Sequence, residues 1–144
     1  MSQTRHQGSP VERLCRLLEK GNFDANSVEW LAYGFRRWLA DDGAAPSLRH
    51  FGLPSTPRRL GLALRDHHLK RAALLVPGKT PWHRARLLSG EIERYQSRKA
   101  TAWSRLPTAP AHASEIEAAL HAASRYADLP GTPQAVRDIL EADY

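Results

Sequence analysis

Apolar residues recur at intervals of three and four along most of the chain, the spacing that places them on one face of an α-helix. No stretch alternates apolar and polar residues with the β-branched enrichment typical of a strand. The pattern therefore predicts an all-α protein with about seven helices. At 144 residues the chain has the length of one domain, so we expect a single compact helical domain over residues 1–144, with residues 1–8 flexible.

The first helix is predicted from Ser9 to Gly21. The sequence SPVE that starts at Ser9 has the form of a capping box with proline at the first helical position, and glycine commonly follows the end of a helix. Cys15, the one cysteine of the chain, lies on the apolar stripe of this helix. Because it has no second cysteine for a disulfide or a zinc site, we interpret it as a small core residue.

The second helix is predicted to start at Asp24 or Ser27 and to end near Gly43. Its apolar residues fit one helical face without a miss, so we expect it to be the core helix. This face consists of Val28, Leu31, Ala32, Phe35, Trp38 and Leu39. Gly34 costs about 1 kcal/mol relative to alanine in a helix, which predicts that another helix crosses close to the backbone there.

A turn motif follows in residues 47–76. Gly52 suits the left-handed conformation that ends a short helix, and Thr56 with Pro57 can start the next helix. This outline resembles a helix-turn-helix and would place Arg58 and Arg59 in the first turn of the second helix, where DNA-reading side chains usually lie. The length of that second helix, about 20 residues, and its apolar content count against its insertion into a groove.

The short helix of this motif is predicted over about residues 46–51. Its spacing places Leu48 and Phe51 on one side and Arg49 and His50 on the other.

Two long helices are predicted next, from residue 57 to about 76 and from 81 to about 105, joined by a Pro-Gly-Lys turn. We expect them to form a central antiparallel hairpin. The buried face of the second consists of Trp82, Ala85, Leu88, Ile92, Tyr95, Ala102 and Leu106. Two prolines in residues 107–113 predict an extended internal connection, after which two shorter helices start at Ser114 and Thr132.

The positive charge is concentrated in the middle of the chain. The net charge is +6, but residues 49–105 contain 13 basic and 3 acidic side chains. Such an excess attracts polyanions, and arginine can donate two hydrogen bonds to one phosphate. We therefore predict a non-enzymatic nucleic-acid-binding protein, either a helix-turn-helix-like regulator or a small subunit of a nucleoprotein assembly. The candidate contacts to DNA or RNA are Arg49, Arg58, Arg59, Lys70, Arg84, Arg94, Arg98 and Arg105.

The same composition permits a different interpretation. Trp, Tyr and Arg are the usual energetic anchors of protein interfaces, and Trp30 and Tyr33 lie off the apolar face of the second helix. This helix either packs on two sides, which we favour, or offers these two aromatic groups to a partner. The chain could therefore be a protein-binding adaptor or inhibitor that uses these two residues. The sequence does not decide between the two hypotheses.

Catalytic and metal-binding motifs are sparse. His67 and His68 are neighbours, so on a helix they point about 100° apart, unlike metal ligands spaced four apart. The sequence GKT at Gly78 lacks the upstream glycine and the strand of a phosphate-binding loop. We expect no enzymatic activity, no metal and no cofactor.

No apolar run approaches the roughly 20 residues that a membrane span needs, and the first ten residues lack the apolar core of a secretory signal. We therefore expect a cytoplasmic protein without a membrane partner. Arginine outnumbers lysine 17 to 4, and alanine is abundant, which is associated with bacterial or phage coding sequences.

Overall fold

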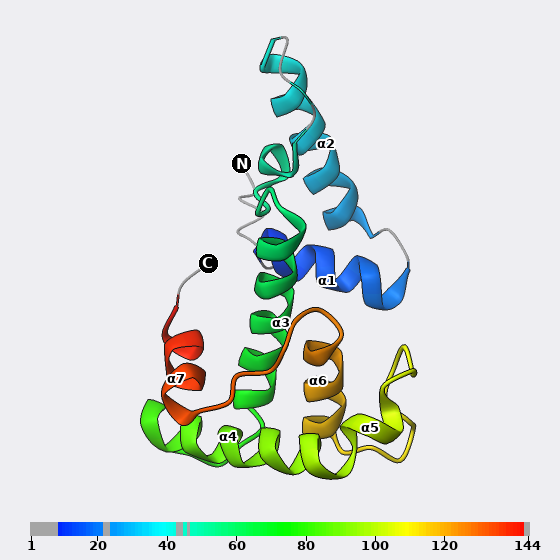
Figure 1. The fold of residues 1–144 in the computed structure, drawn as a ribbon. Helices are drawn as coiled ribbons and strands as arrows, with labels where there is room; N and C mark the ends of the chain where they lie inside the picture. The colour runs from blue at the N-terminus through cyan, green and yellow to red at the C-terminus, as the bar shows by residue number, and fades with distance from the viewer. Residues whose placement is uncertain (1–8, 22–23, 43–44, 46, 143–144) are drawn as a thin grey trace. The chain divides into compact units, whose positions relative to one another are not determined.

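The structure, a computed structural model, describes residues 9–21, 24–42, 45 and 47–142. Within these residues the chain forms seven α-helices, one 3₁₀ helix and no strand, which confirms the predicted all-α class (Figure 1). The segment 1–8, predicted to be flexible, lies outside the described residues. None of the described helices is long and apolar enough to cross a membrane.

The chain divides into two compact units, an N-terminal unit up to Ala63 and a C-terminal unit from Leu64 onward. The prediction of a single folding domain stays a prediction, because two compact units can still unfold together. The N-terminal unit contains α1 (Pro10–Lys20), α2 (Ala25–Ala40), the 3₁₀ helix η1 (Leu48–Phe51) and the start of α3 (Pro57–Ala73). The C-terminal unit contains the rest of α3, α4 (Pro81–Arg98), α5 (Ala100–Trp103), α6 (Glu115–Ser124) and α7 (Pro133–Glu141).

Most helices start where the sequence predicts, because a side-chain oxygen accepts a backbone N–H of the first turn. The N-caps are Ser9, Asp24, Thr56, Thr80, Ser114 and Thr132. Asp24, and not Ser27, starts α2. The backbone N–H of Ser27 donates to the Asp24 carboxylate and lowers the pKa of Asp24, and the Ser27 side chain lowers this pKa further. The predicted capping box at Ser9 is half formed: the Ser9 side chain accepts the Glu12 N–H, but the Glu12 carboxylate accepts a hydrogen bond from Arg16 at 2.6 Å.

The predicted orientation of α2 is wrong. Trp30 and Gly34 are buried, whereas Val28, Phe35 and Leu39 of the predicted core face are each at least half exposed. The reason is that α2 is apolar on two sides and η1 packs on the side of Trp30, whose indole N–H donates to the Phe51 carbonyl at 2.8 Å.

Gly34 does mark a close approach, as predicted, but the approaching group comes from η1 and not from a crossing α-helix. A Cβ atom at Gly34 would lie 2.0 Å from the Phe51 ring. In η1, His50 is buried and Leu48 is exposed, so burial does not follow the apolar and polar sides of this short helix. His50 can be buried because Asp41 and Ser47 satisfy its ring nitrogens.

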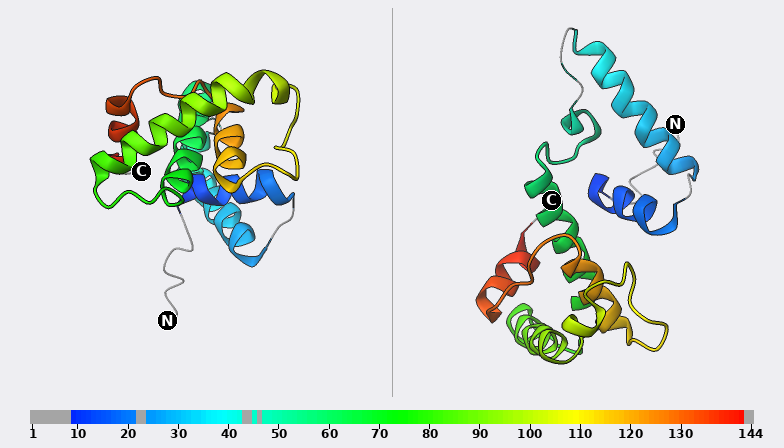
Figure 2. Two further views of the ribbon diagram at one scale, coloured as in Figure 1. Left: turned by 90° about the horizontal axis from the view of Figure 1, so that it is seen from below. Right: turned by 45° about the vertical axis from the view of Figure 1, so that its right-hand side comes forward.

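The core of the C-terminal unit lies where α3, α4, α6 and α7 meet. Its buried apolar residues are Leu69, Ala72, Ala73, Ala85, Leu88, Ile92, Tyr95, Trp103, Leu120, Ala123 and Val136. α4 crosses α3 instead of running back along it, as both views in Figure 2 show, so the predicted antiparallel hairpin is not formed. α4 makes its most extensive contacts with α7.

The predicted helix 81–105 is interrupted. α4 ends at Arg98, and Lys99 leaves the helical conformation before the four residues of α5. The break lets the Trp103 ring turn into the core, whereas Ala102 and Leu106, predicted to be buried, are exposed.

A buried polar network joins α4 to α6. His121 has one ring nitrogen 2.8 Å from the Leu106 carbonyl, so that nitrogen carries the proton, and its other nitrogen accepts from the Tyr95 hydroxyl at 2.9 Å. The hydroxyl of Ser124 lies 3.3 Å from that of Tyr95. Every ring nitrogen of His121 therefore has a partner, which explains how this residue can be 2% exposed.

Candidate nucleic-acid interface

The second half of the turn motif, from Gly52 to Arg59, forms as the sequence predicts. Gly52 has φ +75°, the left-handed conformation, and the Thr56 hydroxyl accepts the backbone N–H of Arg59 at 3.2 Å. These two devices end η1 and start α3. Arg58 and Arg59 consequently lie exposed in the first turn of α3, and Arg49 lies exposed on η1.

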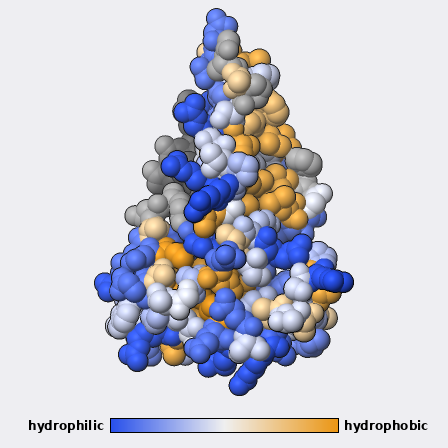
Figure 3. All heavy atoms as spheres, viewed as in Figure 1, coloured by the Kyte–Doolittle hydropathy of each residue, from blue (hydrophilic) through white to orange (hydrophobic). Residues whose placement is uncertain are grey.

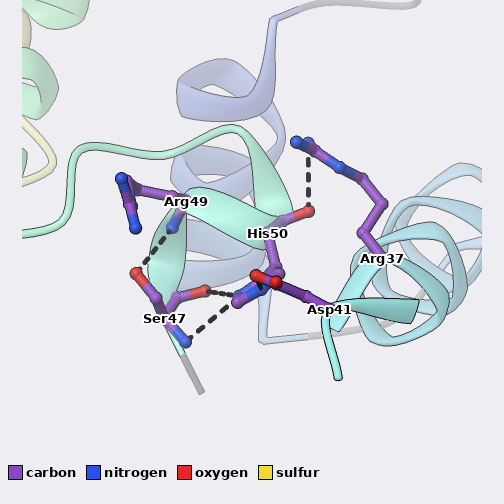
Figure 4. A network of polar contacts seen from close by, with 5 residues as sticks. All are labelled: Arg37, Asp41, Ser47, Arg49 and His50. Atoms are coloured by element: carbon purple, nitrogen blue, oxygen red, sulfur yellow. Dashed lines mark hydrogen bonds and ion pairs between the residues drawn. The ribbon is translucent and has the colours of Figure 1, made fainter. Parts of the chain in front are cut away.

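A polar network fixes η1 to the end of α2 (Figure 4). His50 Nε2 donates to Asp41 Oδ2 at 3.0 Å, its Nδ1 lies 3.3 Å from the backbone nitrogen of Ser47, and Arg37 donates to the His50 carbonyl at 3.4 Å. The Arg49 N–H donates to the Ser47 hydroxyl, while its guanidinium extends away from the network. The network thus holds the backbone of Arg49 and leaves its side chain available.

The first half of the motif differs from a helix-turn-helix. That motif joins two α-helices by a turn of three or four residues, whereas η1 is a single 3₁₀ turn of 4 residues. A helix of this length cannot cross a DNA backbone as the first helix of the motif does. The exposed arginines of the N-terminal unit therefore suit contacts with phosphates better than a recognition helix seated in a groove.

The second candidate surface lies on α4 in the C-terminal unit. Arg94 and Arg98 are exposed on the side of α4 that points away from its buried residues, and Arg94 forms an ion pair with Glu91. Arg105 is also exposed, but it follows the break at Lys99. Arg105 therefore does not continue the helical spacing of Arg94 and Arg98 on α4.

Two of the predicted phosphate contacts, Lys70 and Arg84, donate hydrogen bonds to backbone carbonyls of the chain. The ammonium group of Lys70 donates to the Ala142 carbonyl just after α7, and Lys70 is only partly exposed. Arg84 is also partly buried, and it donates to the Gly78 carbonyl at 3.3 Å. We interpret both as residues that secure chain segments rather than as phosphate contacts.

Three exposed cations of residues 49–105 were not among the predicted contacts: Arg71 in the last turn of α3, Lys79 and Arg86. Lys79 lies in the turn before α4, and Arg86 is on the solvent side of α4. The signal was present in the sequence, because turn residues are usually exposed and Arg86 follows the buried Ala85 directly.

The two residues proposed as anchors for a protein partner have different environments. Trp30 is buried and bonded to Phe51, so it belongs to the core of the N-terminal unit and its assignment as an anchor is wrong. Tyr33 is 58% exposed, and the Arg37 guanidinium lies 5.7 Å from its ring centre.

Within the part of the chain that the structure describes, no group of three or more His, Cys, Asp or Glu side chains is placed to hold a metal ion. Comparisons with known proteins add no assignment: no family model matches the chain, and neither a curated protein nor a solved structure is significantly similar to it.

Proposed function

We propose that this protein is a non-enzymatic nucleic-acid-binding protein that contacts phosphates through exposed arginines. The observation that carries the proposal is the excess of 13 basic over 3 acidic residues in positions 49–105, together with the exposure of six of the predicted contacts. These six are Arg49, Arg58, Arg59, Arg94, Arg98 and Arg105. A regulator or a small subunit of a nucleoprotein assembly would use such contacts.

Each unit contributes its own set of arginines to this proposal. In the N-terminal unit, Arg49, Arg58 and Arg59 come from η1 and the first turn of α3. In the C-terminal unit, Arg94 and Arg98 are one helical turn apart on α4. Their spacing suits successive phosphates of one strand, and guanidinium groups bind phosphate with two hydrogen bonds.

The test is a salt titration of binding to duplex DNA of two unrelated sequences, to RNA and to a polyanion control. If phosphates are bound, the logarithm of the affinity should fall linearly with the logarithm of the salt concentration, with a slope of about 0.9 per contact on B-DNA. The variant Arg94→Ala/Arg98→Ala should weaken binding to all sequences alike and lower the slope by about one per contact removed.

A matched control separates local contacts from net charge. Lys20→Ala/Arg125→Ala also removes two charges, from exposed positions outside the basic segment, and should change the slope little. Equal effects of the two double variants would mean that binding depends only on the net charge of the protein. Absence of nucleic-acid binding at near-physiological salt would refute the proposal.

The variant Arg58→Ala/Arg59→Ala tests the mode of binding in the N-terminal unit. We expect a uniform loss, since η1 is too short for the first helix of a helix-turn-helix. A selective loss of one preferred sequence, at about 1 to 3 kcal/mol per lost base contact, would instead show that these arginines read base edges.

A further inference from the structure

An apolar stripe that is more than half exposed at its large side chains runs along α2 (Figure 3). Among the described residues of the N-terminal unit, the Phe51 ring of η1 packs edge to face on one side of Phe35 and leaves about half of that side chain exposed. The stripe, which we call the α2 stripe, consists of Val28, Ala32, Phe35 and Leu39. The exposed fractions are 53% for Val28, 51% for Phe35 and 73% for Leu39. A contiguous row of large apolar side chains on one helix marks an interaction surface more often than isolated exposed residues do.

The spacing of the α2 stripe identifies the kind of surface that fits it. Its members are four, three and four residues apart, which is the spacing of the d and a positions of a heptad repeat. Helices with this seam pack along each other, with side chains of one inserted between those of the other. The stripe therefore suits a second helix lying nearly parallel or antiparallel to α2.

We propose that the α2 stripe is the interface of a homodimer in which α2 packs antiparallel against α2 of a second copy. A two-fold axis at the middle of the stripe places Val28 opposite Leu39 of the second copy and Ala32 opposite Phe35. Every layer then pairs a small side chain with a larger one, so the seam has even width. A parallel dimer would instead place Phe35 on Phe35 and Ala32 on Ala32, which leaves one layer overfilled and another underfilled.

Charge complementarity supports the same arrangement. Glu29 and Arg36 are both exposed and flank the α2 stripe on one side, at positions of the e type. In an antiparallel pair these positions face each other across the seam, so Glu29 meets Arg36 of the second copy, twice in the dimer. A parallel pair brings e positions next to g positions, which are Leu31 and Trp38 here, and leaves both charges without a partner.

The expected affinity is modest. α2 has 16 residues and is therefore about 24 Å long, so a single helix pair buries less surface than a standard interface of about 1,600 Å². The dimer should form reversibly and depend on protein concentration. This inference does not rest on nucleic-acid binding.

Sedimentation velocity over a range of concentrations tests the interface, on nuclease-treated protein so that bridging by nucleic acid is excluded. The wild type should shift from monomer to dimer as concentration rises. Leu39→Glu should stay monomeric at every concentration and keep its helical circular dichroism, since Leu39 is exposed. Leu74→Glu is the matched control: Leu74 is 77% exposed but belongs to the C-terminal unit, so this variant should dimerise like the wild type.

A charge exchange tests the antiparallel arrangement. Glu29→Arg and Arg36→Glu should each weaken the dimer several-fold, because each places like charges opposite each other. The double variant Glu29→Arg/Arg36→Glu should restore wild-type dimerisation. Failure of the double variant to recover would overturn the antiparallel arrangement.

Two further outcomes would overturn the proposal as a whole. A wild-type protein that stays monomeric at the highest concentration would mean that the α2 stripe is covered by another part of the chain or by a different protein. A dimer that survives Leu39→Glu would place the contact elsewhere.

Discussion

The two long helices α2 and α4 have similar patterns in the sequence and opposite surroundings in the structure. Each shows a regular apolar face, yet Ala85, Leu88 and Ile92 of α4 are at most 2% exposed, whereas Phe35 and Leu39 of α2 are more than half exposed. α4 meets residues of α3, α6 and α7 in one core cluster. α2 contacts α1 and η1. Apart from the ring contact between Phe35 and Phe51, these described neighbours leave the large side chains of the α2 stripe more than half exposed. Periodicity thus identifies residues that share a face but not the element that covers it.

The largest effect should come from truncating equivalent leucines of the two helices. Leu88→Ala removes a fully buried side chain and should lower the free energy of unfolding by about 2 to 5 kcal/mol. Leu39→Ala truncates an exposed side chain and should change it by less than about 0.5 kcal/mol. Urea unfolding of dilute, monomeric protein measures both. Equal losses would show that the α2 stripe is packed in solution, so the apolar faces of α2 and α4 would not differ in burial.

Replacing one glycine in each helix should give effects of opposite sign. Gly34→Ala inserts a Cβ atom into the Phe51 ring, which also contacts Trp30 and Phe35 edge to face, and should destabilise by about 1 to 3 kcal/mol. Gly90→Ala in α4 meets nothing within 4 Å and should stabilise by up to about 1 kcal/mol, because alanine is the better helix former. Thermal unfolding monitored by circular dichroism distinguishes the two, and a stabilising Gly34→Ala would contradict the packing of η1 on α2.

The smallest effect concerns the N-caps. Asp24 caps α2 with a charge and Thr80 caps α4 without one. Since hydrogen bonds from Ser27 lower the pKa of Asp24 below 3.8, its stabilising contribution should be complete above that pH and be lost as the pH falls through the lowered pKa. Asp24→Asn should keep the cap but remove this acid dependence, as an acid titration of helicity can show. Thr80→Ser should leave the acid dependence unchanged.

The local features of the fold could be predicted from the sequence. The caps at Ser9, Thr80 and Ser114 depend on residues no more than three positions away, and each of these side chains accepts a backbone N–H of the first turn as expected. Only the second bond of the capping box at Ser9 is missing, because the Glu12 carboxylate bonds to Arg16. The left-handed conformation of Gly52 is likewise a property of the turn itself. Interactions of this range are contained in a few consecutive residues, so one sequence is enough to predict them.

The features that were missed depend on contacts between distant segments. His50 is buried because Asp41, nine residues away, accepts its hydrogen bond. The break at Lys99 is hidden in the sequence because the apolar spacing continues past it, while Trp103 is drawn into the core by α6.

The candidate site was predictable as a region but not residue by residue. The positive excess of residues 49–105 is visible in the sequence, and it includes the exposed arginines of both units. Lys70 and Arg84 cannot be separated from the others by sequence, because their bonds to the carbonyls of Ala142 and Gly78 appear only in the fold. A basic segment therefore overestimates the number of side chains available to a ligand.

Buried tryptophans give each unit its own optical signal. Trp30 is 6% exposed in the N-terminal unit, and Trp103 is 6% exposed in the C-terminal unit. Exposure of either indole to water on unfolding should shift its fluorescence to longer wavelength. Trp38 in the N-terminal unit and Trp82 in the C-terminal unit also fluoresce, so both are first replaced by Phe. Adding Trp30→Phe or Trp103→Phe to this background then leaves one buried tryptophan, in one unit only. Coincident denaturation curves for the two variants, after correction for their stabilities, would mean that the units unfold as one cooperative domain, and separate curves would mean that they unfold independently.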